Sequence, residues 1–231
     1  MIEVNHLYHS FYVGKKNRRQ EVSVLKNINL NIEAGEIVSI VGRSGSGKST
    51  LLNLLSGYIK PSSGEVRIQG ENVTNFTESQ WAGFRADHLG FIFQSFQLIP
   101  SMTSFQNVEL PLVMQGVPDK QRKQKVAEIF KRVELEGLEG HYPSELSGGQ
   151  QQRVSVARAL VVNPPIILAD EPTGSLDNET EAELLAFIQQ LNKEEGITFV
   201  IITHDEEVAS IADRTVRLEG GSILEEEEMS R

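Results

Sequence analysis

Short apolar runs rich in β-branched residues recur along the chain. They lie at residues 37–42, 89–93, 166–169 and 199–203. Runs of this kind are typical of strands buried on both faces, and stretches with helical character separate them. The first run is followed by leucines at 51, 52, 54 and 55 and a stop at Gly57, which indicates a helix. This order predicts an α/β fold with a parallel sheet and helical crossovers.

Other stretches alternate between apolar and polar residues, as half-buried strands do. Alternation over residues 22–36 and 64–73, between glycine turns, predicts a small antiparallel sheet near the N-terminus. Residues 217–224 contain two glycines between apolar residues and predict a hairpin. The acidic end from residue 225 predicts a solvated tail.

The middle of the chain has helical patterning. Between residues 94 and 160 helical stretches dominate, and 119–133 is clearly amphipathic. We therefore predict one domain over residues 1–231 with a helical insert at 95–159. Residues 1–94 and 160–231 then form the β-subdomain and the core.

Composition and charge narrow the function classes. Of 231 residues, 22 are Lys or Arg and 32 are Asp or Glu, which gives a net charge of −10 and disfavours a broad nucleic-acid-binding face. The chain has no cysteine, which excludes disulfides and thiolate metal sites. No secretory signal is recognised at the start, and no apolar run approaches the roughly 20 residues that span a bilayer. We expect a soluble chain that reaches a membrane only through a partner.

The segment GRSGSGKST follows the first buried run. Gly42, Gly47, Lys48 and Ser49 match the phosphate-loop pattern G-x-x-x-x-G-K-[ST], at the junction of a strand and a helix. Backbone N–H groups and the helix start suit phosphate oxygens, Lys48 adds a positive charge, and the Ser49 hydroxyl suits Mg²⁺. The alternative is a flexible Gly/Ser turn. The pattern predicts binding of a nucleoside triphosphate with Mg²⁺.

Polar residues follow three of the buried runs. Asp170 and Glu171 end the run that begins at 166, where they suit Mg²⁺ and an attacking water respectively, or else form a turn or helix cap. Gln94 and His204 follow two other runs and suit the metal and the terminal phosphate, although such residues are often structural. Together with the phosphate loop, these residues favour hydrolysis over binding alone.

A second glycine-rich stretch, LSGGQQQR at 146–153, precedes a helical stretch. A serine hydroxyl and paired glycine amides at a helix start again suit phosphate. One chain thus has two such helix starts, but only one of them belongs to a nucleotide loop.

With these motifs in this order, the chain resembles the nucleotide-binding domains of ATP-binding cassette (ABC) proteins over essentially its whole length. GRSGSGKST, the glutamine after GFIF, LSGGQ, LADEP, SLD and THD all occur in the family's order. The resemblance implies a P-loop, RecA-like core with a β-subdomain and a helical insert. It also implies ATP hydrolysis by a homodimer in which the phosphate loop of one copy and the signature LSGGQ of the other enclose each ATP.

The resemblance also implies a role for individual residues. Glu171 is the expected catalytic base, His204 the switch histidine, and Asp177 is expected to cross the dimer interface. The catalytic positions are Glu171, His204 and Gln94, and the Mg²⁺ positions are Ser49, Gln94 and Asp170. The nucleotide-binding positions are Phe11, Gly42, Ser44, Gly45, Gly47, Lys48, Ser49, Thr50, Ser147, Gly148, Gly149, Gln150 and Asp177. Phe11 replaces the family's usual tyrosine as the ring that stacks on adenine, and neighbouring Tyr12 is the alternative.

Longer strings resemble one branch of the family. FRADHLGFIFQSFQLIPSMTSFQNVELPL and ILADEPTGSLD are similar to the lipoprotein-releasing, macrolide-exporter, bacitracin-type and cell-division ATPases. The resemblance implies a bacterial cytoplasmic motor held at the inner membrane face by a separate permease, with an extracytoplasmic adaptor as a further partner. Residues 96–112 are the expected permease surface, or else part of the insert core. The alternative function is regulation of an extracytoplasmic enzyme, and neither the substrate nor the permease can be inferred.

Overall fold

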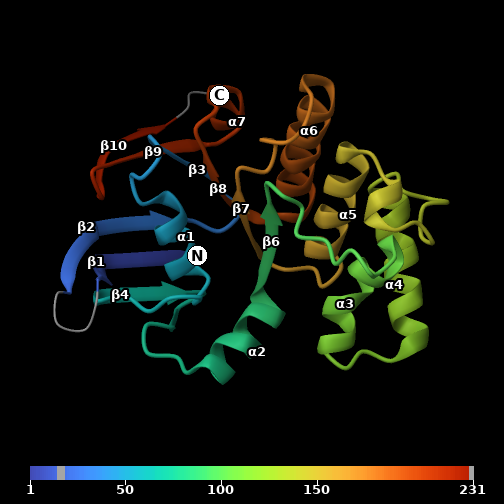
Figure 1. Ribbon diagram of the computed structural model, residues 1–231, viewed down its shortest axis with the longest axis horizontal. Coiled ribbons are helices and arrows are strands. Elements are labelled where there is room, and N and C mark those ends of the chain that lie inside the picture. Colours follow the sequence, from blue (N-terminus) through green and yellow to red (C-terminus); the bar gives the residue numbers. More distant parts are fainter. Residues whose placement is uncertain (15–18, 229–231) are drawn as a thin grey trace. The chain divides into compact units, whose positions relative to one another are not determined.

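The computed structural model describes residues 1–14 and 19–228 (Figure 1). It divides into two compact units. The first comprises Met1–Trp81 and Leu191–Arg231, and the second comprises Ala82–Gln190.

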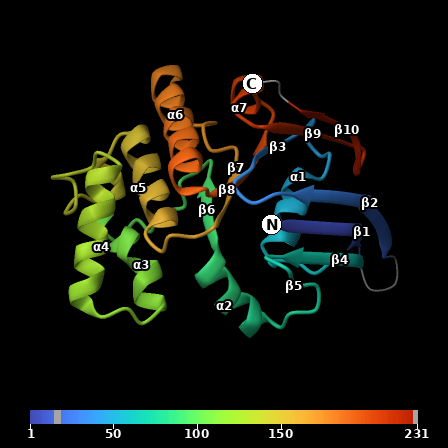
Figure 2. The same cartoon turned by 180° about the vertical axis from the view of Figure 1, so that it is seen from behind.

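An antiparallel sheet forms one part of the first unit (Figure 2). Its strands, in spatial order, are β2 (Gln20–Ile32), β1 (Ile2–Val13), β4 (Ser63–Ile68) and β5 (Glu71–Asn72). Strand β1 has irregular register, with shifts between Val4 and Leu7 and again on either side of His9. His6 lies within the first irregularity with φ +47°, so the inward positions continue from Leu7 instead of His6.

A second sheet of the first unit is mainly parallel. Its centre is β3 (Ile37–Val41), which pairs in parallel with β8 (Thr198–Thr203) and β9 (Arg214–Glu219). All six side chains of β8 and four of the five in β3 are buried, as expected of a parallel sheet that is covered on both faces. Helices α1 (Lys48–Leu55) and α7 (Glu206–Ser210) contact β8.

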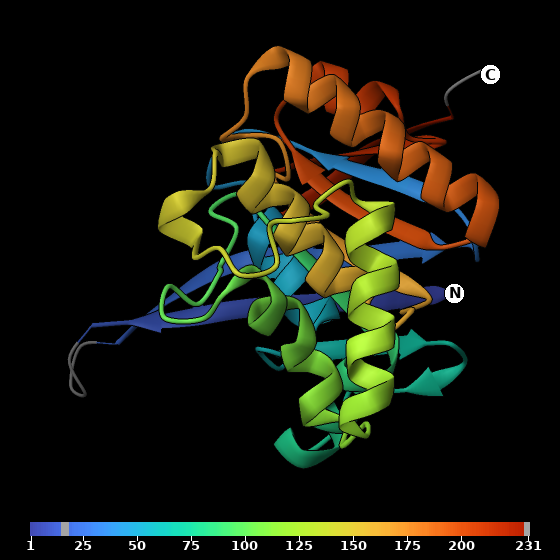
Figure 3. The same ribbon diagram turned by 90° about the vertical axis from the view of Figure 1, so that its right-hand side faces the viewer.

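Helices predominate in the second unit. Strands β6 (Leu89–Phe93) and β7 (Ile166–Asp170) pair in parallel. Helices α3 (Ser104–Met114), α4 (Asp119–Arg132) and α5 (Gly148–Leu160) pack against one another (Figure 3), with the short 3-10 helix η1 (Pro143–Glu145) before α5. Helices α2 (Glu78–His88) and α6 (Asn178–Glu195) lead into and out of the unit.

The structure confirms the buried strands, the helix after the phosphate loop, the amphipathic helix and the terminal hairpin. The hairpin turns at Gly220 and Gly221, but β10 (Ser222–Glu228) continues past the predicted hairpin. The prediction of a solvated tail from residue 225 is therefore wrong for residues 225–228, because their backbone pairs with β9. Residues 229–231 of that tail lie outside the described residues. Helices α3, α4 and α5 lie at or near the predicted insert, whose division at 95 and 159 remains a prediction.

Candidate functional site

Backbone geometry explains the glycines of the phosphate loop. Gly45 and Gly47 have φ of +79° and +109°, a left-handed region that L side chains rarely adopt. At Gly42 a Cβ atom would lie 2.2 Å from the carbonyl oxygen of Leu218 on β9. The loop therefore requires glycine at these positions, whether or not a ligand is bound.

Lys48 begins helix α1 and turns back over the loop. Its Nζ donates to the carbonyl oxygen of Gly42 at 2.7 Å and to that of Arg43 at 3.4 Å. Gly47 is the N-cap and has no side chain to cap the first-turn N–H groups, so an oxyanion can accept from them. Of the other predicted positions, Ser44, Gly45 and Ser49 are exposed and Thr50 is half-buried. The loop thus combines a cation, a helix start and exposed hydroxyls.

His204 lies at the same end of the sheet as the phosphate loop. Val41 and Thr203 are register partners in β3 and β8, and Gly42 and His204 are the next residues. The side chain of His204 is exposed, and the following Asp205 caps α7 by accepting from the N–H of Glu207 at 2.8 Å. The first unit therefore places these two predicted site elements at one sheet edge.

The second unit brings Gln94 and the two acids together. Phe93 and Asp170 are register partners, and the N–H of Gln94 donates to the carbonyl oxygen of Asp170 at 2.9 Å. The Gln94 amide also donates through Nε2 to the carbonyl oxygen of Gly174 at 3.4 Å. Glu171 follows in a left-handed conformation, with φ +48°, where the chain turns away from β7. A left-handed residue other than glycine is uncommon and marks a constrained turn.

The signature residues Ser147 and Gln150 cap the start of helix α5. The Ser147 Oγ accepts from the N–H of Gln150 at 3.3 Å, and the Gln150 Oε1 accepts from the N–H of Ser147 at 2.9 Å. The Ser147 hydroxyl keeps its proton free to donate, because in this bond it is the acceptor. Gly148 is exposed at the helix start.

Gly149 and Asp177 meet the same residue, Thr180 on α6. A Cβ atom on Gly149 would lie 2.7 Å from the Thr180 Cγ2. The Asp177 carboxylate accepts from the N–H of Thr180 at 3.1 Å and from its hydroxyl at 3.0 Å. These hydrogen bonds lower the pKa of Asp177, so its carboxylate stays ionised to a lower pH than an ordinary aspartate. The sequence analysis did not identify Thr180, although an aspartate before a helical stretch is a helix-start signal whose side chain accepts from an N–H two or three residues later.

Two aromatic rings near the N-terminus remain alternatives for adenine. Phe11 on β1 is 41% exposed, and its ring meets the His9 ring edge to face, with centroids 4.6 Å apart. Tyr12 points to the other side of the strand and is 65% exposed. Stacking of adenine on Phe11 stays a prediction.

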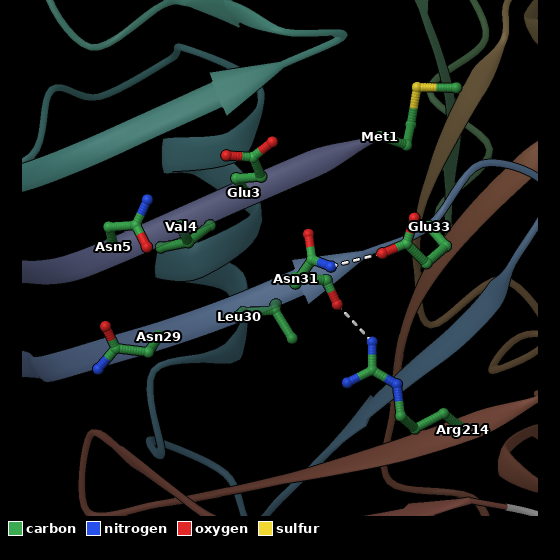
Figure 4. Close-up of a pocket in the computed structure, with 9 residues that line it drawn as sticks. All are labelled: Met1, Glu3, Val4, Asn5, Asn29, Leu30, Asn31, Glu33 and Arg214. Carbon is green, nitrogen blue, oxygen red and sulfur yellow. Dashed lines mark hydrogen bonds between the residues drawn. The ribbon is translucent and has the colours of Figure 1, made fainter.

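The first unit also has a cavity outside the motifs. It measures about 560 Å³ and is lined largely by polar residues of β1 and β2 together with Arg214 (Figure 4). Glu3 and Glu33 line this cavity. The Arg214 guanidinium donates hydrogen bonds to the carbonyl oxygen of Asn31 and to the Glu36 carboxylate. Two carboxylates would repel a triphosphate, so this cavity is unsuited to ATP.

Comparison with known proteins identifies the family. The model of the family described as "ABC transporter" matches residues 25–174. This chain belongs to the ABC transporter family. It is an ATP-binding ABC ATPase with the ABC ATPase fold.

Relatives of this ABC ATPase match it over nearly its whole length. It is 64% identical over 221 residues to the ATP-binding protein YtrE of Bacillus subtilis, with 96% of each chain covered. It is 45% identical to the macrolide export ATP-binding/permease protein MacB of Rhodopirellula baltica, covering 98% of this chain but only a third (33%) of MacB.

A solved structure also resembles the ABC ATPase over its whole length. The cassette MJ0796 of Methanocaldococcus jannaschii, solved as a dimer in a post-hydrolysis state with ADP and Pi, superposes with a TM-score of 0.91. Both chains are fully covered at 41% identity. Within residues 1–14 and 19–228, no helix is long and apolar enough to span a membrane.

Proposed function

We propose that two copies of this ABC ATPase enclose two ATP molecules and hydrolyse them to drive a membrane permease. One observation carries the proposal: a single chain has two glycine-rich helix starts suited to phosphate, at α1 and at α5. In a head-to-tail pair, the α5 start of one copy serves the ATP held by the α1 start of the other. The dimer of MJ0796 with ADP and Pi supports this arrangement.

The oxygen donors of the chain fit Mg²⁺. Ser49, Gln94 and Asp170 offer a hydroxyl, an amide oxygen and a carboxylate, which are the hard ligands that Mg²⁺ prefers. Among the described residues, no three His, Cys, Asp or Glu side chains cluster as a metal site, and Mg²⁺ in nucleotide sites commonly takes its other ligands from phosphates and water. Bound Mg²⁺ would neutralise charge on the phosphate oxygens.

Each of the remaining predicted residues binds ATP or takes part in its hydrolysis. Lys48 and the first-turn N–H groups of α1 hold the phosphates, with adenine stacked on Phe11. Glu171 orients the attacking water and accepts its proton, and His204 contacts the terminal phosphate. From the partner copy, the Ser147 hydroxyl and the N–H groups of Gly148 and Gly149 meet the same ATP, and Gln150 and Asp177 line the interface.

The permease surface that we propose lies after Gln94. The side chains of Phe96, Leu98, Ile99 and Phe105 are all half-exposed, so apolar area remains for a partner. We propose that the permease is a separate chain. YtrE, which matches this chain in length, is named an ATP-binding protein, whereas the longer MacB is named an ATP-binding/permease protein. The ATPase would then lie at the inner membrane face, and an extracytoplasmic adaptor is a further expected partner.

The experiment that tests the dimer uses Glu171→Gln. This change keeps the size of the side chain but removes the proposed base, so ATP stays bound and the dimer should accumulate. Size-exclusion chromatography with light scattering should show dimer with MgATP and monomer without it. Glu179→Gln, an exposed carboxylate in the first turn of α6, is the matched control and should not accumulate dimer. A Glu171→Gln protein that binds MgATP but stays monomeric would refute the sandwich for the isolated chain.

A further inference from the structure

The loop that follows Gln94 contains two consecutive left-handed residues that are not glycine. Phe96 has φ +61° and Gln97 has φ +50°. A left-handed conformation is unfavourable for any residue with a Cβ and particularly so for a bulky one such as phenylalanine. Such a turn persists only where neighbouring structure holds it.

Arg158, near the end of helix α5, holds this turn. Its Nη2 donates to the carbonyl oxygen of Phe96 at 2.8 Å, and its Nη1 donates to that of Gln97 at 2.6 Å. Within the described parts of the chain, Arg158 forms no ion pair, so its hydrogen bonds go to the backbone of this loop. Burial lowers the pKa of Arg158, but an arginine remains charged at neutral pH.

Phe96 also reaches the other end of the same helix. A Cβ atom on Gly148 would lie 4.0 Å from the Phe96 Cζ. The carbonyl oxygen of Phe96 thus accepts a hydrogen bond from Arg158 near the end of α5. The ring of Phe96 lies close to Gly148 of the signature, at the start of the same helix. The loop is therefore bonded to the helix near its end and lies close to its start.

The next part of the loop is held by helix α3. The buried Asn107 accepts from the N–H of Ile99 at 2.8 Å and donates to the carbonyl oxygens of Ile99, Met102 and Thr103. Helices α3 and α5 pack against each other. Residues 96–103 are therefore held to a packed pair of helices and not free to move alone.

We propose that Arg158 is a positioning residue that makes the loop at 95–97 move with the signature helix α5. Through this clamp, a shift of α5 at its Ser147 end changes the position of Gln94 and of the apolar surface at 96–99. This coupling rests on the proposed function, in which α5 meets the ATP of the partner copy. The clamp itself is a property of the chain without nucleotide.

The first test measures the clamp without nucleotide. Arg158→Met removes both donors, so amide hydrogen exchange at Phe96 and Ile99, whose N–H groups are bonded in the structure, should speed up about tenfold. Arg153→Met is the matched control, because Arg153 is on the same helix and bonds Glu134 and Glu183 instead of the loop. Unchanged exchange in Arg158→Met, or equal acceleration in both variants, would overturn the clamp.

Two further variants separate positioning from general stability. Arg158→Lys keeps the charge but loses the planar fork, so its exchange should lie between those of the parent and Arg158→Met. In the Arg158→Met protein, Gln97→Gly removes one source of strain and should restore part of the protection at Phe96. Absence of any restoration would show that Arg158 does not act on the left-handed turn.

The second test measures coupling to ATP in the Glu171→Gln background. ATP should change exchange at Ile99 when Arg158 is present, and Arg158→Met should abolish at least about nine-tenths of that change. An equal response in both proteins would overturn the coupling. Failure of Glu171→Gln to dimerise would count against the proposed function, while the comparison without nucleotide would still decide whether the clamp exists.

Discussion

Several predicted site residues have a structural contact as well as a proposed role with ATP. Ser147 and Gln150 cap each other, Asp177 caps α6, and Lys48 bonds the carbonyl oxygens of its own loop. A substitution at any of them changes folding and binding together. Loss of activity in such variants therefore indicates a binding role only when the free energy of unfolding is measured beside it.

His9 is a single residue with a predicted effect on stability. It is 7% exposed, and burial lowers its pKa from the ordinary value of 6.5. Because the folded protein favours the neutral imidazole, the unfolded chain binds more protons as the pH falls below 6.5, and stability is lost. We expect the Tm of the parent protein to fall a few degrees more between pH 7 and pH 5 than that of His9→Leu.

Thermal melts monitored by circular dichroism at several pH values would measure this difference. His141→Leu is the control, because His141 is less buried than His9. It should retain the pH dependence of the parent. Identical pH dependence in His9→Leu and the parent would exclude His9 as the cause.

At the scale of helices and strands, the sequence predicted the central strands because burial on both faces leaves continuous apolar runs. It did not predict β1, because the irregular register near His6 and His9 interrupts the alternation of inward side chains. The phosphate loop and the signature were recognisable from local spacing. Arg158 was not recognised as a loop clamp, although it is the one charged residue in the apolar stretch 154–162 and could have been noted for that reason.

The contact between helices α5 and α6 gives a prediction at this scale. In Gly149→Ala the new methyl group would meet the Thr180 Cγ2, and threonine has little rotamer freedom in a helix. We expect the free energy of unfolding to fall by about 1–3 kcal/mol, which urea denaturation would measure. Gly83→Ala is the control, because its Cβ would meet nothing within 4 Å, and it should stabilise α2 by about 0.5–1 kcal/mol. An unchanged midpoint in Gly149→Ala would show that the contact with Thr180 costs no more than the helix gains from alanine, which contradicts the prediction.

At the scale of the whole molecule, the sequence predicted two half-sites and a candidate permease surface at residues 96–112, but neither the permease nor its cargo. The motifs predict which residues bind phosphate, because that chemistry depends on local backbone and charge. The cargo and the permease depend on surfaces of other chains, which leave no pattern here. The half-exposed side chains of Phe96 and Phe105 leave apolar area that suits a partner surface.

The net charge of the whole molecule predicts how salt changes the affinity of the dimer. Each copy carries −10, and each ATP adds further negative charge, so two loaded copies repel each other over long range. We expect the monomer–dimer dissociation constant of Glu171→Gln with MgATP to fall about threefold or more between about 20 mM and 200 mM NaCl. Analytical ultracentrifugation would measure it. Weaker association at the higher salt would mean that attraction across the interface exceeds the repulsion of the whole molecules.

The methyl group of Thr180 limits the order in which this chain can change in evolution. Serine at this position would keep the hydroxyl that bonds Asp177 and would remove the Cγ2 that opposes a Cβ on Gly149. Thr180→Ser is thus a permissive first step, after which alanine becomes tolerable within the signature. In the reverse order, the same two changes pass through a destabilised protein. The substitutions that the signature tolerates at Gly149 therefore depend on a residue that is far from it in the sequence.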